Sequence, residues 1–268
     1  MIMWCWPKVI RLDAMICWTS VCSQAKGPGW QMVKKKLVIL ANSIKRNARC
    51  VAGREVTAKD GRYSVGPWIR PISIHGEGEL DCAETTCSDG SHIELMQFAE
   101  IALAAAVNDI YQPENWTIAG PRCWRKLDWP YGPVDHKLLL ESPADLWFDR
   151  AEKRTDRISH ERLKTNPPAQ SLYVIRPEDL HLRFYKEYNS FKERDERKSR
   201  GAFTYKGVKY DFTLRDPVAS KKYCSEFPAS GAPPKEVGFS KDNGPLVCVS
   251  VASDFKGFHY KILATVIE

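Results

Sequence analysis

Proline and glycine interrupt this 268-residue chain so often that they limit which folds it can adopt. Seventeen prolines and sixteen glycines argue against a long helical bundle. Short apolar or alternating segments, such as 36–42 and Trp68–Ser73, are typical of β-strands. No stretch reaches about 18 uncharged apolar residues, which excludes a membrane-spanning helix. The 43% hydrophobic and 27% charged residues exclude disorder along the whole length. We therefore expect a soluble, mainly β protein with minor α structure.

The positive charge of the chain is concentrated in two segments. The formal net charge is +7, of which residues 183–209 contribute +5 and residues 1–31 contribute +2, so the remainder sums to zero. A local basic surplus is a mild indication of a polyanionic partner, although many basic proteins have none.

The first 31 residues differ in composition from the rest. They hold four of the nine tryptophans and three of the nine cysteines. Lys8, Arg11 and Asp13 interrupt every candidate apolar core of a secretory signal. We interpret 1–31 as a non-native or disordered extension and Met32 as the natural start. Without an export signal, the expected location is cytoplasmic, with reduced thiols.

The charged stretch 149–166 ends in Pro167-Pro168 and is the best candidate for a linker. It divides the chain into a first half, 32–166, and a second half, 167–268. In the first half, Ala-rich 94–110 is expected to be a helix by propensity, with a strand as the alternative. A short helix is expected at 138–147 and a long surface loop at 75–92. Gly53 indicates a close backbone approach or a cap.

The second half is predicted to consist almost wholly of β-strands. Candidate strands are 172–175, 180–185, 202–205, 208–214, 246–251 and 260–267, with a hairpin turn at Lys206-Gly207 and a loop at 228–245. Five or six short strands over about a hundred residues suit a small closed barrel or a sandwich, and an OB-type barrel is a natural candidate.

Several strings, in order along the chain, resemble the dual OB-containing domain, a bacterial family of two linked OB-like barrels. They include Val38–Ser43, Arg49–Glu55, Trp68–Ser73, Gln112–Trp116, Phe203-x-Tyr205-x-Gly207-x-x-Tyr210, Asp216-Pro217, Val247–Ser250 and Tyr260-Lys261. The resemblance spans about 33–267. It implies two linked OB-like small β-barrels that form a nucleic-acid- or nucleotide-binding module, often associated with bacterial conflict and defence systems. It supplies no catalytic residues.

OB barrels bind single strands by combining a basic groove with aromatic rings on which bases stack. The residues that fit this chemistry supply charge, stacking platforms or hydrogen bonds to a base edge or phosphate. They are Asn42, Ser43, Lys45, Arg46, Arg49, Arg54, Trp68, Arg70, Asn115, Trp116, Arg200, Tyr205 and Tyr210. The expected partner is single-stranded nucleic acid or a nucleotide.

Each of these residues also has a structural interpretation. Tryptophans and tyrosines more often fill a core than stack on bases. The run 192–200 alternates in charge, which is typical of a solvated helix or loop. Arg49, Arg54 and Arg70 fit a phosphate clamp, but ties between the halves through Glu55 or Glu114 are about as plausible.

Catalysis and metal binding receive little support from the sequence. His75, Cys82, Cys87 and His92 fall within eighteen residues but lack the tight pair spacing of zinc sites, so we expect no metal or other cofactor. No nucleotide-hydrolase, dinucleotide, zincin or serine-hydrolase motif is present, and we expect no enzyme. Two alternatives remain. One is a protein-interaction or sensor subunit. The less favoured one is a metal-dependent nuclease that uses Asp109, Glu114 and Asp135, or Asp211 and Asp216.

Overall fold

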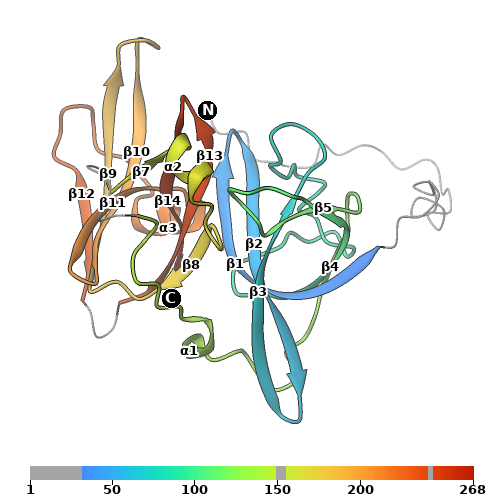
Figure 1. Cartoon of the computed structure of the whole chain (residues 1–268). Coiled ribbons are helices and arrows are strands. Elements are labelled where there is room, and N and C mark those ends of the chain that lie inside the picture. Colours follow the sequence, from blue (N-terminus) through green and yellow to red (C-terminus); the bar gives the residue numbers. More distant parts are fainter. Residues whose placement is uncertain (1–31, 149–154, 241–243) are drawn as a thin grey trace, which may run out of the picture.

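The computed structural model describes residues 32–148, 155–240 and 244–268; the expected extension 1–31 lies outside this part. The described chain forms two β-sheets that lie beside each other, each bent into a barrel, with three short helices (Figure 1). None of the helices in the described ranges is long and apolar enough to span a membrane.

The first barrel contains six strands. They are β1 (Val33–Lys45), β2 (Ala48–Lys59), β3 (Arg62–Ile72), β4 (Phe98–Ala106), β5 (Asn115–Ile118) and β6 (Trp124–Lys126). The order is β1-β2-β3-β5-β4, and β4 pairs back with β1 to close the barrel, while β6 adds to β4. The β3–β5 pair is parallel and the other pairs are antiparallel.

Gly53 lies where β2 crosses the bulged part of β1. A β-carbon at this position would lie 2.3 Å from the carbonyl oxygen of Val38, closer than any side chain tolerates. The pairing register of β1 and β2 shifts between Ile39 and Ala41, beside Gly53. The expected close backbone approach is therefore confirmed.

The helix expected over 94–110 is wrong, since the segment holds strand β4. Ala99, Ile101 and Leu103 alternate into the barrel interior and are fully buried. β4 pairs with β1 on one side and with β5 and β6 on the other. Alanine-rich helix propensity amounts to a fraction of a kcal/mol per residue, and barrel closure with apolar burial overrides it.

The second barrel contains eight strands. They are β7 (Arg157–Ser159), β8 (Leu172–Ile175), β9 (Asp179–Asn189), β10 (Arg194–Tyr205), β11 (Val208–Leu214), β12 (Lys235–Phe239), β13 (Leu246–Phe255) and β14 (Phe258–Ile267). The order is β12-β9-β10-β11-β14-β13-β8, with β7 on β14. Only 176–178 separate β8 from β9, so the chain itself joins the two sides. The β11–β14 pair is parallel, like β3–β5.

The expected hairpin of the second barrel is confirmed. β10 and β11 meet at Lys206-Gly207, whose φ angles are 48° and 76°. Two successive positive φ angles give the turn that suits the right-handed twist of paired strands. Two neighbouring expectations are wrong in part. Of the run 192–200, residues 194–200 belong to β10 and the first two lie in the turn before it, and the expected loop 228–245 holds strand β12 at 235–239.

The helices α1 (His136–Leu139), α2 (His160–Thr165) and α3 (Pro217–Tyr223) are short. The helix expected at 138–147 is wrong beyond Leu139. Leu140 is extended, and Glu141 donates its backbone N–H to Val174 of β8. Pro143 also disfavours helical geometry at Ser142. Within the expected linker, 155–166 forms β7 and α2, and β7 pairs with β14.

Candidate nucleic-acid interface

The outer side of β1–β3 in the first barrel is covered by the second barrel. Val38, Leu40 and Trp68 belong to one apolar cluster with Leu172 and Leu246 of the second barrel. Thr265 of β14 donates a hydrogen bond of 2.6 Å to the carbonyl of Leu40. Figure 1 shows β1 and β2 facing β8, β13 and β14 between the two barrels. Because OB barrels commonly bind through strands 2 and 3, the first barrel has this face largely occupied.

Arg70 lies in this contact between the barrels rather than on an open surface. Its Nη2 donates to Ser171 Oγ at 3.0 Å and Ser250 Oγ at 2.8 Å, and lies 3.4 Å from Glu114 Oε1. Ser171 also donates to Glu114 through its hydroxyl. The structural alternative, a tie between the halves through Glu114, matches these contacts.

Two more expected contact residues serve the same junction. Trp68 is 4% exposed, and its Nε1 donates to Glu141 Oε2 at 3.1 Å. Asn115 is buried, with its amide donating to Asp109 Oδ2 at 3.1 Å. Neighbouring Gln112 donates to the carbonyl of Val251 in the second barrel at 2.9 Å. Neither Trp68 nor Asn115 offers a surface to a ligand in this structure.

Tyr205 and Tyr210 are part of the core of the second barrel. Both are buried, Tyr210 stacks on Phe203 with ring centroids 5.1 Å apart, and the Tyr205 hydroxyl donates to the carbonyl of Pro143. Burial raises the pKa of Tyr205. Their placement favours the packing interpretation over base stacking.

Basic side chains at the end of the β1–β2 hairpin lie beside acidic side chains of the loop that follows β3. Lys45 lies 3.1 Å from Glu77 and 3.3 Å from Glu79, and exposed Arg46 also pairs with Glu77. The hydrogen bonds from Lys45 and Arg46 hold the pKa of Glu77 below its usual value. The positive charges are thus largely balanced here.

The remaining expected residues of the first barrel are dispersed. Ser43 is buried and donates to Cys50, and Asn42 donates its amide to Ile93. Half-buried Arg54 donates to the carbonyl of Gly66 at 2.9 Å. Trp116, which lies beneath Lys35 at 6.0 Å, and Arg49 are also partly exposed. The first barrel therefore does not bring its expected residues into one groove.

Arg200 belongs to a basic face on the outside of the second barrel. Leu182 and Phe184 of β9 point into the core. Because side chains alternate along a strand, Arg183 and Tyr185 point outward. Across the ladder, Arg200 is opposite Arg183, and Lys198 is opposite Tyr185. We call Arg183, Tyr185, Lys198 and Arg200 the basic face.

Every cation of the basic face has a carboxylate partner: Lys198 lies 3.0 Å from Glu196 and 3.8 Å from Glu187, and Asp211 joins the two arginines. Asp211 of β11 accepts from Arg200 Nε at 2.9 Å and from Arg183, and Arg200 also donates to Thr213 Oγ1 at 3.0 Å. Two guanidinium groups therefore share a single negative charge. Such planar, charged donors on β9 and β10 are suited to phosphate oxygens, and here they are held in a fixed orientation.

The β9–β10 hairpin extends beyond the basic face and ends in a turn with exposed aromatic rings. Phe191 is 99% exposed and Tyr188 is 61% exposed, which is unusual for large apolar side chains. In the described ranges, neither Lys186 nor Arg194 of this hairpin has an acidic side chain within 4.0 Å. Figure 1 shows the hairpin extending past the rest of the barrel. We call Tyr188, Phe191, Lys192 and Arg194 the hairpin tip.

A second exposed aromatic group lies at the β13–β14 turn. Phe255 is 54% exposed and Phe258 is 38% exposed. Arg157 of β7 lies over Phe258 at 5.7 Å and over Tyr260 at 4.8 Å. The sequence interpretation missed these rings and the hairpin tip. An alternation of aromatic and basic residues around Lys256-Gly257 and 188–194 was the available signal.

The carboxylates considered for a nuclease have structural partners. Asp216 is 2% exposed and accepts from the backbone N–H groups of Val218, Ala219 and Val266, while Asp211 is shared by two arginines. The His75–His92 loop does not gather its histidines and cysteines: in the described ranges, three metal-ligating side chains meet only at His160, Asp254 and His259.

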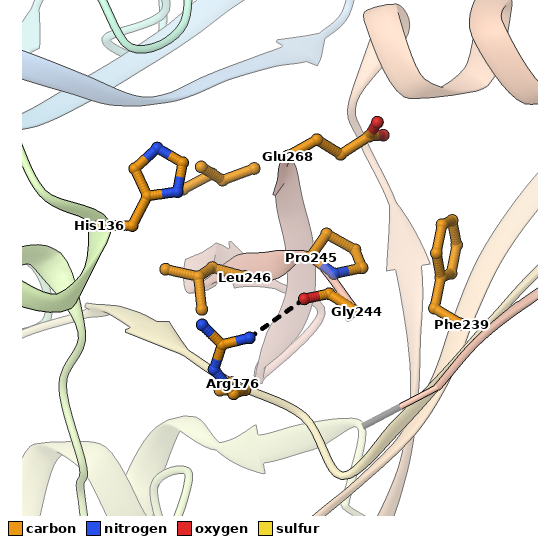
Figure 2. A pocket seen from close by; sticks show the side chains of 8 residues that line it. His136, Arg176, Phe239, Gly244, Pro245, Leu246 and Glu268 are labelled. Carbon is orange, nitrogen blue, oxygen red and sulfur yellow. Dashed lines mark hydrogen bonds between the residues drawn. The ribbon is translucent and has the colours of Figure 1, made fainter. Parts of the chain in front are cut away.

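A small pocket near the C-terminus has a volume of about 250 Å³ (Figure 2). Arg176, which donates to Gly244, lies on one side of it, and His136 and Glu268 lie on others. Ligand pockets typically measure about 300–1,000 Å³. The size of this hollow therefore gives no support to a nucleotide pocket here.

The closed barrel β1-β2-β3-β5-β4 and the path β9-β10-β11-β14-β13 of the second sheet share one strand order, each with one parallel pair at the same place, and this order defines a tandem OB-type protein. The chain belongs to the dual OB-containing domain family, whose profile matches residues 35–266. The expected fold of two linked OB-like barrels is confirmed. No curated protein matched the sequence.

Among solved structures, the chain is similar to the p204 HINb domain, with 10% identity and a TM-score of 0.31, covering 89% of this chain and 98% of that one. It is also similar to a replication protein A heterotrimer bound to ssDNA, with 8% identity and a TM-score of 0.31, covering 92% of this chain and 51% of that one. Similarities this remote do not determine what this chain binds.

Proposed function

We propose that this protein is a non-catalytic module that binds single-stranded nucleic acid through the basic face and hairpin tip of its second barrel. The observation that carries the proposal is that two exposed rings lie between cations along one hairpin, whose strands also carry two arginines held by Asp211. Bases would stack on Tyr188 and Phe191, and phosphates would contact the cations of the basic face. Nucleic-acid binding is also what the family resemblance implies.

The first barrel has a supporting role in this proposal. Its strands β1–β3 pack on the second barrel, and the charges at its β1–β2 turn are balanced by Glu77 and Glu79. The second barrel offers a basic surface on β9, β10 and the loop that joins them, and the corresponding strand 1–2 loop is one of the usual binding elements of an OB fold. Action within a bacterial conflict or defence system is the wider role that the resemblance implies.

Binding of the full chain to labelled single-stranded DNA and RNA across a salt series tests the proposal. Affinity should fall steeply with salt, and the slope should drop by about 0.7 for each phosphate contact removed by Lys186→Ala or Arg194→Ala. Arg46→Ala is the matched control, because Arg46 is exposed but already paired with Glu77. Its slope should stay unchanged.

The aromatic contribution is tested separately. Tyr188→Ala and Phe191→Ala should each weaken binding by about five- to 150-fold, since a base stack contributes about 1–3 kcal/mol. Ile74→Ala, which changes an apolar side chain that is 72% exposed elsewhere, serves as the control. Absence of binding at low salt would refute the proposal and favour a protein-docking role for the exposed rings.

A further inference from the structure

Three side chains with metal-ligating atoms meet beside the β13–β14 turn. Asp254 is near the end of β13, His259 is the second residue of β14 and lies opposite Asp254, and His160 begins α2 directly after β7. The backbone holds them together: β7 pairs with β14 at Ile158 and His259, and His160 donates its N–H to the carbonyl of Gly257 at 2.9 Å. No sequence motif joins these residues, because His160 and His259 lie 99 positions apart.

Two of the distances between the ligating atoms are close to those found around a small metal ion. His160 Nδ1 lies 3.2 Å from His259 Nε2 and 3.7 Å from Asp254 Oδ1, and all three atoms lie within 4.8 Å of one another. A tetrahedral ion with bonds of about 2.0–2.1 Å to nitrogen and oxygen places its ligands about 3.3 Å apart. Small side-chain rotations would suffice to bring the three atoms to this spacing.

The outward-facing nitrogen of each imidazole has a partner suited to orient it. His259 Nδ1 lies 3.0 Å from the carbonyl of Ala252, which fixes the proton on Nδ1 and leaves the Nε2 lone pair facing the cluster. His160 Nε2 lies 3.1 Å from the hydroxyl of Tyr111, which can accept its proton and leave Nδ1 free to ligate. Metal-bound histidines almost always have such second partners.

Burial distinguishes this cluster from a chance surface grouping. His259 is 1% exposed, and the Tyr111 ring covers both imidazoles, with centroids 5.0 Å from His160 and 4.8 Å from His259. The Asp254 side chain is 43% exposed, so solvent reaches the cluster from that side. Three protein ligands with one open, solvent-facing position would result.

We propose that His160, Asp254 and His259 form a divalent transition-metal site of the zinc class, with water or an exogenous anion in the fourth position. Two imidazoles and a carboxylate suit Zn²⁺ and disfavour Mg²⁺ or Ca²⁺, which prefer all-oxygen sites. The ion would cross-link the β7–α2 segment to the β13–β14 hairpin next to the Tyr111 loop of the first barrel.

The competing explanation is a metal-free hydrogen-bond chain. Tyr111 would donate to His160 Nε2, and His160 Nδ1–H would donate to His259 Nε2. This series of hydrogen bonds does not include Asp254, whereas the metal site needs Asp254 as a ligand. Replacement of Asp254 therefore separates the two explanations.

The experiment is a titration of the chelator-treated full chain with Co²⁺, followed by displacement with Zn²⁺. We expect visible d–d bands that saturate at one equivalent, without the near-ultraviolet absorption of a cobalt–thiolate bond. His160→Ala and Asp254→Asn should each weaken binding at least tenfold, and Tyr111→Phe by about ten- to 100-fold. His92→Ala and Cys82→Ser, which alter the histidine- and cysteine-containing loop, should bind as the parent does.

A thermal-shift series supplies the structural readout. Zn²⁺ should raise the Tm of the parent chain by mass action and raise that of Asp254→Asn less at the same metal concentration, while the metal-free forms melt together. Asp254 is exposed, so this variant should fold even if His160→Ala does not. Unchanged affinity in Asp254→Asn, thiolate absorption, or no Co²⁺ bands at millimolar metal would overturn the site.

Discussion

Replacement of Arg70 by alanine tests whether this arginine ties the barrels together or contacts a ligand. The side chain of Arg70 is 10% exposed and that of its partner Glu114 is 3% exposed. Arg70→Ala removes the hydrogen bonds to Ser171 and Ser250 and leaves the Glu114 carboxylate buried without its cation. Breaking a buried ion pair by removing one partner costs about 3–5 kcal/mol. Typical domains are stable by about 5–15 kcal/mol, so the loss should be large.

Urea denaturation measures this loss, and the nucleic-acid salt series measures ligand affinity on the same samples. We expect the free energy of unfolding to fall by about 3–5 kcal/mol while the affinity of the folded protein stays within about twofold. The double variant Arg70→Met with Glu114→Gln should recover part of the stability, because no buried charge remains. A loss below about 1 kcal/mol with a tenfold drop in affinity would refute the structural role and restore Arg70 to the binding site.

Three further outcomes follow from the packing and burial of individual side chains. Gly53→Ala places a β-carbon against the Val38 carbonyl and should lower the free energy of unfolding by about 1–3 kcal/mol or more, measured by thermal denaturation. An unchanged Tm would contradict the close approach. Asp216→Ala removes the cap of α3 and leaves the Val266 N–H unpaired, so urea denaturation should show a loss of about 2–4 kcal/mol; a loss under 0.5 kcal/mol would refute the capping role. Burial raises the pKa of Cys123 to about 12, so its reactive thiolate is scarce at pH 8, whereas Cys82 is exposed. Alkylation followed by peptide mass spectrometry should label Cys82 first and Cys123 only as the pH rises; equal rates at pH 8 would argue against this burial.

The strand pattern was readable from the sequence wherever local preference and tertiary packing agreed. The hairpin at Lys206-Gly207 is such a case, because its turn residues and flanking strands favour the same structure. β4 is the opposite case, since its alanines favour a helix and only pairing with β1 and β5 makes it a strand. Which elements pair across the chain is not encoded in local propensity.

The candidate site was less predictable than the fold. Arg70 and Trp68 fit a ligand-binding pattern equally well in sequence, and only the packing of the second barrel shows that they are covered. The basic residues beside Phe191 were the available local signal, but the sequence alone does not show that this ring lies exposed at a hairpin tip rather than in a core. His160 and His259 meet through the β7–β14 pairing, which no spacing rule anticipates.

The packing of the first barrel against the second has a consequence for how many nucleotides one molecule can occupy. Tandem modules on a flexible linker gain avidity because the second binding event becomes intramolecular. Here Arg70, Thr265 and the shared apolar cluster hold the first barrel's usual contact strands against its neighbour. Under the proposed function, one molecule would therefore occupy the footprint of one OB fold, about 4–16 nucleotides, rather than twice that length. Lengthening the oligonucleotide beyond that footprint should allow additional protein molecules to bind and should not increase the affinity of the first.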